Sequence, residues 1–437
     1  MKKIQKVHIK RYLSNLDIQS WFCIISFLGF IATMLVFFIS HGTVFPKLFC
    51  GDTFDTGMDF FHSIEYTRGR SPYELFNTLY PPLANLFFYL LYRLVPFDQS
   101  SLWANTFDDS IAARGTSIDL RVWQPTLMLF IGFIVITAIA LVLLVQSILG
   151  HSAKSGMIGL FMVFSYGTLY SFERGNIVIV AALCSMFFVA YKDSSNAFFK
   201  ELALIALGAG AGLKVYPAVF GLLLLYEKEY YKAARAILYG LILFIAPVFV
   251  FHGGISNLSF ALRKIMAYSG GMPELSSIGY SFDKILNSFV LIFQYLWDFE
   301  ISEVSWITFT AWTNKILFLA LLFRGFFLCK KWQKILACTL SFLVYQTQPI
   351  YVLTCMLIPL VFMLKEEKKI NKSNFIPFTA LVFSQILLPI CDIDTANISF
   401  VFFRIQVCIL VLIVWIFSTK GTKLNILKYI KNNIKIK

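Results

Sequence analysis

Long apolar runs recur along the whole of this 437-residue chain and restrict what it can fold into. A helix needs roughly 20 consecutive apolar residues to cross a bilayer, and several runs come near this length. Segments that span lipid must be helices or barrel strands, and these runs lack the alternation of barrel strands. Because 58% of the residues are hydrophobic and only 14% are charged, the composition excludes a soluble globular protein. The sequence predicts an all-α polytopic membrane protein.

The apolar runs predict about twelve transmembrane helices in a single membrane domain, residues 1–437, without an internal repeat. The predicted spans are 21–40, 122–150, 156–172, 176–191, 201–213, 216–226, 236–251, 304–329, 334–346, 350–364, 375–391 and 399–418. Two long segments between spans, 41–121 and 252–303, are predicted to lie on the outer side. Each contains a helix expected to lie along the membrane surface, at 81–97 and 285–297.

The positive charges orient the predicted spans. The segments expected in the cytoplasm, which include the N-terminus and the tail 419–437, hold 24 of the 38 Lys and Arg residues. This bias follows the positive-inside rule, so both termini are predicted to be cytoplasmic, in a plasma membrane. Reading 81–97 as a full span would instead turn the basic segments 330–334 and 365–374 outward. The same rule accounts for the net charge of +14, and the sequence has no visible nucleic-acid-binding motif.

The eight cysteines give no sign of a metal centre. They are scattered, mostly within apolar runs, and have neither a CxxC pair nor the spacing of metal ligands. Cys50 and Cys391 both fall near predicted outer helix ends, so a disulfide between them stays open. The cysteine pattern therefore predicts no metal site, and the sequence indicates no cofactor.

The most polar stretch, residues 50–83, follows the first predicted span and holds several acids. Asp55 and Asp59 are four residues apart, and Asp52 precedes Asp55 by three, so a helical turn would place them on one face. A carboxylate here is a candidate general base that deprotonates a hydroxyl acceptor. Two alternatives stay open, namely helix capping in a solvated loop and the binding of a divalent cation through oxygen ligands.

Basic residues on the same predicted face are candidates for binding a phosphate. Lys214 lies between two short predicted spans, and a charge at membrane depth normally has a partner unless it snorkels to the interface. Arg174 lies where another span opens on the same side. Arg68 and Arg70 carry planar forks that suit phosphate, or they pair with the neighbouring acids. The phosphate of an anionic lipid would satisfy these cations.

Amides and tyrosines near these cations are candidates for binding sugar hydroxyls. Asn176 is either a ligand for a hydroxyl or an ordinary N-cap. Tyr216 follows Lys214 closely in the sequence. The remaining candidates, whose alternative role is the polar closure of a helical hairpin, are Gln346, Gln348 and Tyr351.

A phosphate-bearing lipid donor and a hydroxyl acceptor indicate glycosyl transfer from a polyprenyl-phosphate sugar, with the phosphate as leaving group. The predicted acceptor is a lipid-linked glycan or an envelope polysaccharide on the outer face. The alternative is a transporter, flippase or polymerase of polysaccharide export, which should have repeated halves and paired ionisable residues at the midplane. Such halves are not visible, and the basic residues within predicted spans are Arg324, Arg404 and Lys315.

The order of these motifs resembles glycosyltransferase family 87, the polyprenyl-phosphate-mannose-dependent transferases of the GT-C superfamily. The similar elements are Asp55, the aromatic run 60–66, Gly69 with Pro72-Tyr73, Tyr80-Pro81-Pro82, Gly175-Asn176, and Lys214 through Pro217. They cover residues 50–225. The segment 346–349 departs from the family pattern, so the resemblance does not extend to the choice of sugar.

The resemblance implies a GT-C fold, an outward-facing cavity, metal-independent transfer of a hexose, and inversion at the anomeric carbon. It transfers the catalytic Asp of the family to Asp55, with Asp59 as a near rival. Asp52, Tyr73 and Tyr80 complete the candidate substrate-binding residues.

Overall fold

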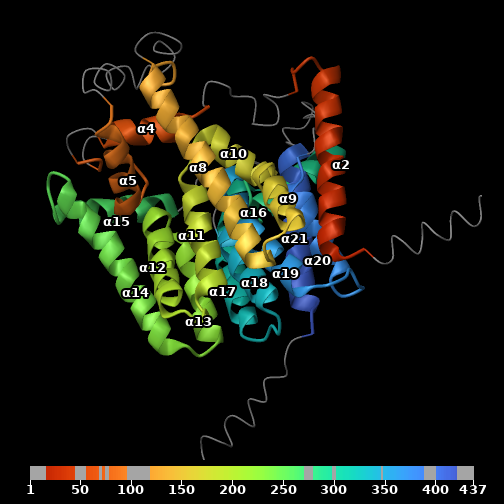
Figure 1. The fold of residues 1–437 in the computed structure, drawn as a ribbon. Coiled ribbons are helices and arrows are strands. Elements are labelled where there is room, and N and C mark those ends of the chain that lie inside the picture. Colours follow the sequence, from red (N-terminus) through yellow and green to blue (C-terminus); the bar gives the residue numbers. More distant parts are fainter. Residues whose placement is uncertain are drawn as a thin grey trace, which may run out of the picture.

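The structure, a computed structural model, describes most of the chain: residues 16–44, 56–67, 71–73, 78–95, 119–269, 279–297, 302–345, 348–387 and 400–420. Every regular element within these residues is a helix, which confirms the predicted all-α class (Figure 1). The two cysteines considered for a disulfide, Cys50 and Cys391, lie outside the described residues.

Twenty helical elements follow one another in the described residues, and those labelled η are 3₁₀ helices. In chain order they are α2 (Ile18–Ile39), α4 (Met58–Tyr66), α5 (Pro82–Tyr92), α8 (Gln124–Leu149), α9 (Ala153–Val163), α10 (Tyr166–Arg174), α11 (Val178–Tyr191), α12 (Ala197–Leu213), η2 (Tyr216–Gly221), α13 (Leu222–Tyr226), α14 (Tyr230–Ile245), η3 (Ala246–Val250), α15 (Ser256–Ser269), α16 (Phe282–Trp297), α17 (Glu303–Gly325), α18 (Lys331–Tyr345), η4 (Ile350–Met356), α19 (Leu357–Glu366), α20 (Phe375–Gln385) and α21 (Phe400–Ser418).

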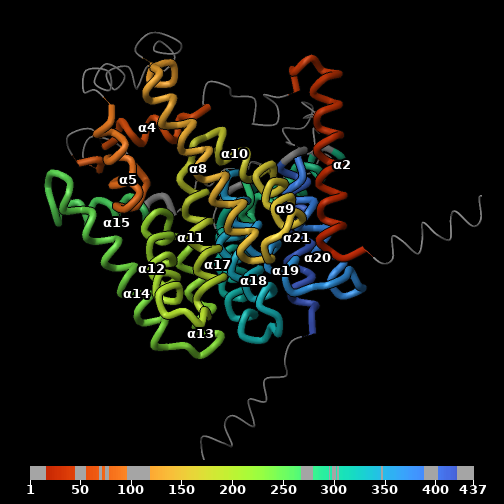
Figure 2. Tube along the Cα trace, in the orientation of Figure 1, coloured from red at the N-terminus to blue at the C-terminus, as the bar shows by residue number. Residues whose placement is uncertain are grey.

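Two neighbouring helices, α18 and α19, form the buried centre of the bundle. They pack against each other, and every residue from Leu357 to Leu364 is buried. The N-terminal helix α2 closes the bundle against its C-terminal part (Figure 2). Thr33 donates a hydrogen bond to the carbonyl of Leu387 at 2.6 Å, and Gln19 donates to the carbonyl of Leu364 at 3.1 Å. Segments from the two ends of the chain therefore share one core.

The outer helices expose apolar side chains. Helices α2, α8, α14 and α17 carry rows of exposed large residues, such as Leu35, Ile136, Leu241 and Ile316. Soluble proteins rarely expose contiguous apolar surface of this extent. Lipid tails are as apolar as these side chains, so a bilayer around the bundle accounts for them. By length and composition, the described helices that can cross a membrane are α2, α8, α17 and the combination of α14 with η3.

The predicted number of twelve spans is not confirmed. The described residues contain four candidate spans, or five if α9 and α10, which are bent by 54°, count as one. Helices lie at most of the other predicted positions, but they are shorter than the roughly 20 residues that a bilayer needs. Prolines at the starts of η2 and η3 contribute to this shortening, because proline interrupts α-helical hydrogen bonding.

Gly208 on α12 allows α14 to approach closely, since an added Cβ would meet the backbone nitrogen of Gly240 at 2.8 Å. We predict that Gly208→Ala destabilises the protein by about 1–3 kcal/mol, because the two backbones must separate. Gly132→Ala on α8 is the matched control, since its Cβ would have no described heavy atom within 4 Å. Thermal unfolding in detergent measures both variants. Equal melting temperatures would contradict this account of the contact between α12 and α14.

Candidate functional site

Asp59, in the first turn of α4, connects this helix to the junction between α10 and α11. Its Oδ1 accepts a hydrogen bond from Arg174 Nη2 at 3.3 Å, and its Oδ2 accepts one from Asn176 Nδ2 at 2.7 Å. The Asp59 side chain keeps 21% of its surface exposed, and that of Arg174 keeps 17%. A carboxylate offers about four lone-pair positions. Asp59 is therefore fixed in place and still accessible to a small molecule.

The backbone of Gly175 makes the junction between α10 and α11 possible. Its φ of 65° is left-handed, and it ends α10. An added Cβ would lie 2.5 Å from the Cβ of Phe60 and 2.7 Å from the ring of Phe130. Only glycine fits this turn without displacing its neighbours. The turn places Asn176 opposite Asp59.

The side chain of Asn176 is fully buried and ties three elements together. Its Oδ1 accepts a hydrogen bond from the backbone nitrogen of Val178, the first residue of α11, at 3.0 Å. Its Nδ2 donates to Asp59 and, at 3.1 Å, to the hydroxyl of Tyr80. These contacts use both ends of the carboxamide, and Asn176 is not the N-cap of α11, because that position is Ile177.

Glu173, which the sequence analysis did not select as a site residue, anchors the entry to α4. The hydroxyl of Thr56 donates to its Oε1 at 2.6 Å, and the backbone nitrogen of Gly57 donates to its carbonyl at 2.7 Å. Both contacts join the last turn of α10 to the residues that precede α4. A signal that could have found it is its place in the polar run 172–176, FERGN, directly before Arg174.

Lys214 ends α12 and lies between two tyrosine rings. Its Nζ is 4.2 Å from the ring centroid of Tyr80 and 5.6 Å from that of Tyr351. Aromatic faces attract a cation, but they do not neutralise its charge. Among the described residues, no carboxylate lies within ion-pair distance of this ammonium group. The group is therefore suited to receive an anion.

Burial keeps the two tyrosines near Asp59 neutral. It raises the pKa of Tyr80, in the connection before α5, well above its usual value, and the charge of Asp59 adds to the rise. The same two causes raise the pKa of Tyr66 to about 12. Both phenols therefore keep their protons at physiological pH and can serve as hydrogen-bond donors.

The structure brings together six of the predicted site residues, which we call the Asp59 cluster: Asp59, Tyr80, Arg174, Asn176, Lys214 and Tyr351. Three other candidates contact neighbouring protein groups. Tyr73 donates to the carbonyl of Tyr80 at 2.8 Å, Tyr216 stacks on Phe342 at 5.0 Å, and Gln348 donates to the carbonyl of Phe342 at 3.4 Å.

The other five candidates lie outside the described residues, namely Asp52, Asp55, Arg68, Arg70 and Gln346. The sequence predicts Asp52, Asp55 and Asp59 on one face of a helical turn. Helix α4 begins at Met58, so it contains Asp59 but neither of the other two acids. Within the described part of the chain, no group of three or more His, Cys, Asp or Glu residues could hold a metal ion.

We predict that Gly175→Ala disrupts the junction between α10 and α11 and destabilises the protein by about 2–4 kcal/mol, because strain in the left-handed region adds to two close contacts. Gly150→Ala is the matched control, since Gly150 also has a positive φ but an added Cβ would meet no described heavy atom within 4 Å. Thermal unfolding should show a clearly lower melting temperature for Gly175→Ala. If the two variants lost the same stability, the close packing around Gly175 would not matter as described.

Comparison with known proteins agrees with the expected resemblance. The model of glycosyltransferase family 87 matches residues 78–347, more than half of the chain, while no curated protein matches. The match starts later than the predicted resemblance and continues well beyond residue 225. It includes all of the Asp59 cluster except Asp59 and Tyr351. The chain therefore belongs to glycosyltransferase family 87 and is a membrane glycosyltransferase.

Proposed function

We propose that the protein transfers a hexose from a polyprenyl-phosphate donor to a hydroxyl group of a lipid-linked glycan or an envelope polysaccharide. We place the reaction at the outer face of the plasma membrane, with both termini in the cytoplasm. One observation carries the proposal, namely that an accessible carboxylate and an ammonium group are both linked to Tyr80: Asp59 shares the donor Asn176 with the Tyr80 hydroxyl, and Lys214 lies over the Tyr80 ring. Such an arrangement suits a reaction that removes a proton at one point and releases a phosphate at another.

The reaction requires a base, and Asp59 and Asp55 are the two candidates. The carboxylate takes the proton of the acceptor hydroxyl while the hydroxyl oxygen forms a bond to the anomeric carbon. The bond between that carbon and the phosphate oxygen breaks, and the phosphate leaves with the electron pair. Attack from the side opposite the leaving group inverts the anomeric configuration.

Lys214 is the group that we expect to stabilise the leaving phosphate. Negative charge grows on the phosphate oxygen as the sugar departs, and a fixed ammonium group favours this growth. The rings of Tyr80 and Tyr351 hold the ammonium in place without neutralising it. A carboxylate partner would instead compete with the phosphate.

Arg174 joins the two parts of the reaction. Its ion pair with Asp59 orients the carboxylate, and its guanidinium has further N–H groups that suit phosphate oxygens. If Asp55 is the base, Asp59 holds Arg174 and Asn176 in position for it. In that case, removal of the Asp55 carboxylate would remove the proton acceptor, whereas removal of the Asp59 carboxylate would leave Arg174 and Asn176 without the group that positions them.

We predict that Asn replacement of the base lowers kcat by about 10²–10⁴-fold, because the proton then has no acceptor. Membrane vesicles with the wild type, Asp55→Asn or Asp59→Asn are incubated with polyprenyl-phosphate mannose and lipid-linked glycans of the host. Asp17→Asn is the control, since Asp17 is the N-cap of α2 and Asn caps equally well. Full activity in both test variants would exclude a carboxylate of this segment as base.

We predict that Lys214→Gln lowers kcat/KM for the donor by roughly 100-fold, because the growing phosphate charge loses its cation. Lys214→Arg should recover part of this loss, since it restores the charge. Lys154→Gln is the control, because Lys154 pairs with Asp17 and is 40% exposed. Donor consumption by inserted protein measures all three variants, and an unchanged kcat/KM for Lys214→Gln would remove Lys214 from the mechanism.

A further inference from the structure

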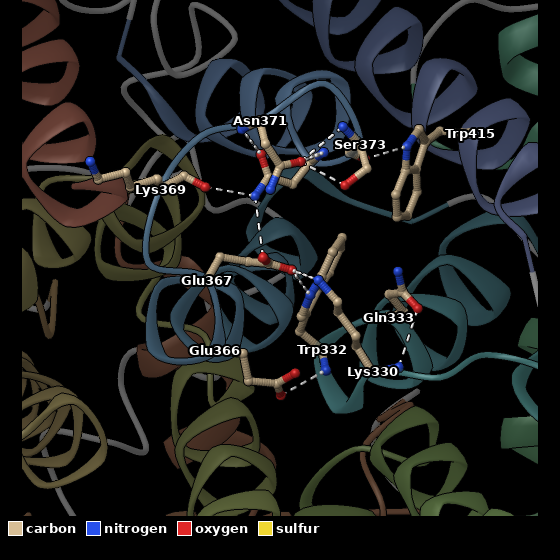
Figure 3. Close-up of polar contacts among 10 residues, drawn as sticks. Lys330, Trp332, Gln333, Glu366, Glu367, Lys369, Asn371, Ser373 and Trp415 are labelled. Atoms are coloured by element: carbon tan, nitrogen blue, oxygen red, sulfur yellow. Dashed lines mark hydrogen bonds and ion pairs between the residues drawn. The ribbon is translucent and has the colours of Figure 1, made fainter. Parts of the chain in front are cut away.

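A cavity of about 530 Å³ lies where three separate segments of the chain meet. It is lined by the start of α18, the connection between α19 and α20, and the end of α21. Figure 3 shows polar contacts among residues of these three segments. We call it the basic cavity, because its lining includes Lys330, Lys372 and Lys420 against one carboxylate, Glu367. The same three segments belong to those that charge distribution predicts to be cytoplasmic.

The basic cavity is remote from the Asp59 cluster. Tyr351 of the cluster lies at the start of the continuous helical pair η4 and α19, and Glu367 of the cavity directly follows its end. A helical segment of that length extends about 29 Å, which is close to the thickness of the hydrocarbon core of a bilayer. The two sites therefore lie at opposite ends of the bundle, and the cavity is independent of the proposed sugar transfer.

The one carboxylate of the lining is already satisfied. Glu367 is 8% exposed and accepts hydrogen bonds from the indole nitrogen of Trp332 at 3.0 Å and from Asn374 Nδ2 at 3.3 Å. The ammonium group of Lys330 completes this set (Figure 3). Glu367 thus neutralises Lys330 and fixes the wall of the cavity.

Other donors of the lining have no such partner. Among the described residues, neither Lys372 nor Lys420 has a carboxylate within ion-pair distance. The amide oxygen of Gln333 accepts from the backbone nitrogen of Lys330 at 3.3 Å, so its amide nitrogen is left to donate. The cavity therefore presents two positive charges and an amide donor to whatever enters it.

Two tryptophans form the apolar side of the cavity. The rings of Trp332 and Trp415 stack with centroids 5.3 Å apart and planes 19° apart. The indole nitrogen of Trp415 donates to the carbonyl of Ser373 at 3.2 Å, which joins α21 to the connection before α20. Tryptophan and lysine together are typical of the level of lipid headgroups.

We propose that the basic cavity binds the phosphate headgroup of an anionic membrane phospholipid. Lys372, Lys420 and the Gln333 amide would hold the phosphate oxygens, and the Trp415 indole, held in place by its stacking on the buried Trp332, would contact the glycerol and the first methylene groups. Basic pockets between transmembrane helices on the cytoplasmic side are suited to anionic lipids, because the bilayer supplies the ligand at high local concentration. A bound lipid would tie α18, α20 and α21 together.

Native mass spectrometry of the full chain in neutral detergent tests this proposal. Short-chain phosphatidylglycerol, short-chain phosphatidylcholine and inorganic phosphate are added in separate titrations. The test variant is Lys372→Gln with Lys420→Gln. The control is Lys365→Gln with Lys368→Gln, which removes two exposed lysines of the same region that do not line the cavity.

The wild type and the control pair should retain phosphatidylglycerol in preference to phosphatidylcholine. The test pair should bind phosphatidylglycerol roughly tenfold or more weakly, since two lysines near the headgroup are lost. Equal binding of the two lipids by the wild type, or equal loss in both lysine pairs, would overturn the proposal. If inorganic phosphate alone occupied the protein as well as phosphatidylglycerol did, the ligand would be a soluble anion and the lipid assignment would be wrong.

Discussion

The proposed site depends on the hydrogen bonds of one buried group, the carboxamide of Asn176. Its oxygen accepts from the first backbone nitrogen of α11, and its nitrogen donates to both Asp59 and Tyr80. A buried amide that loses its partners costs about 1–3 kcal/mol, so this residue both fixes the local fold and orients the carboxylate. Gly175 makes its position possible, because a larger residue would collide with Phe60. The turn between α10 and α11 therefore brings the site residues together, and they do not lie on a single helix face.

The lysines at the two sites have different partners. At the Asp59 cluster, Lys214 lies between tyrosine rings. In the basic cavity, Lys330 forms an ion pair with Glu367, whereas Lys372 and Lys420 have no carboxylate within ion-pair distance among the described residues. A cation without a carboxylate partner near lipid is costly unless an anion arrives. We propose phosphate for both places, as a leaving group at one end and as a lipid headgroup at the other.

The apolar runs were sufficient to predict the fold class and most helix positions, because composition and length alone decide them. The run 176–191, for example, corresponds closely to α11 (Val178–Tyr191). The break between α9 and α10 was not predicted, since Ser165 stands within a run that reads as one apolar span. Several described helices are shorter than a bilayer needs, so the number of spans depends on how these short helices pack together. Sequence periodicity gives no information on that packing.

The site was predicted in part. Lys214, Arg174, Asn176 and Asp59 stood out because polar groups are rare in this chain, yet the contact between Asp59 and Arg174 joins residues 115 positions apart. Spacing along the sequence does not encode such a contact. Glu173 was not selected as a site residue because its role lies in holding Thr56 and Gly57. Tyr216 and Gln348 had polar groups in the right region, but their contacts with Phe342 depend on the packing of α18.

The most direct measurement follows one labelled molecule, a polyprenyl-phosphate mannose, in vesicles that contain the purified protein and an acceptor glycan. Separation of the lipids shows whether the donor is cleaved, and a reagent that cannot cross the bilayer shows on which side. The account predicts that free polyprenyl phosphate and a glycosylated acceptor form together on the outer side. Donor that stays intact would contradict this prediction, and donor that crosses the bilayer unchanged would also favour transport.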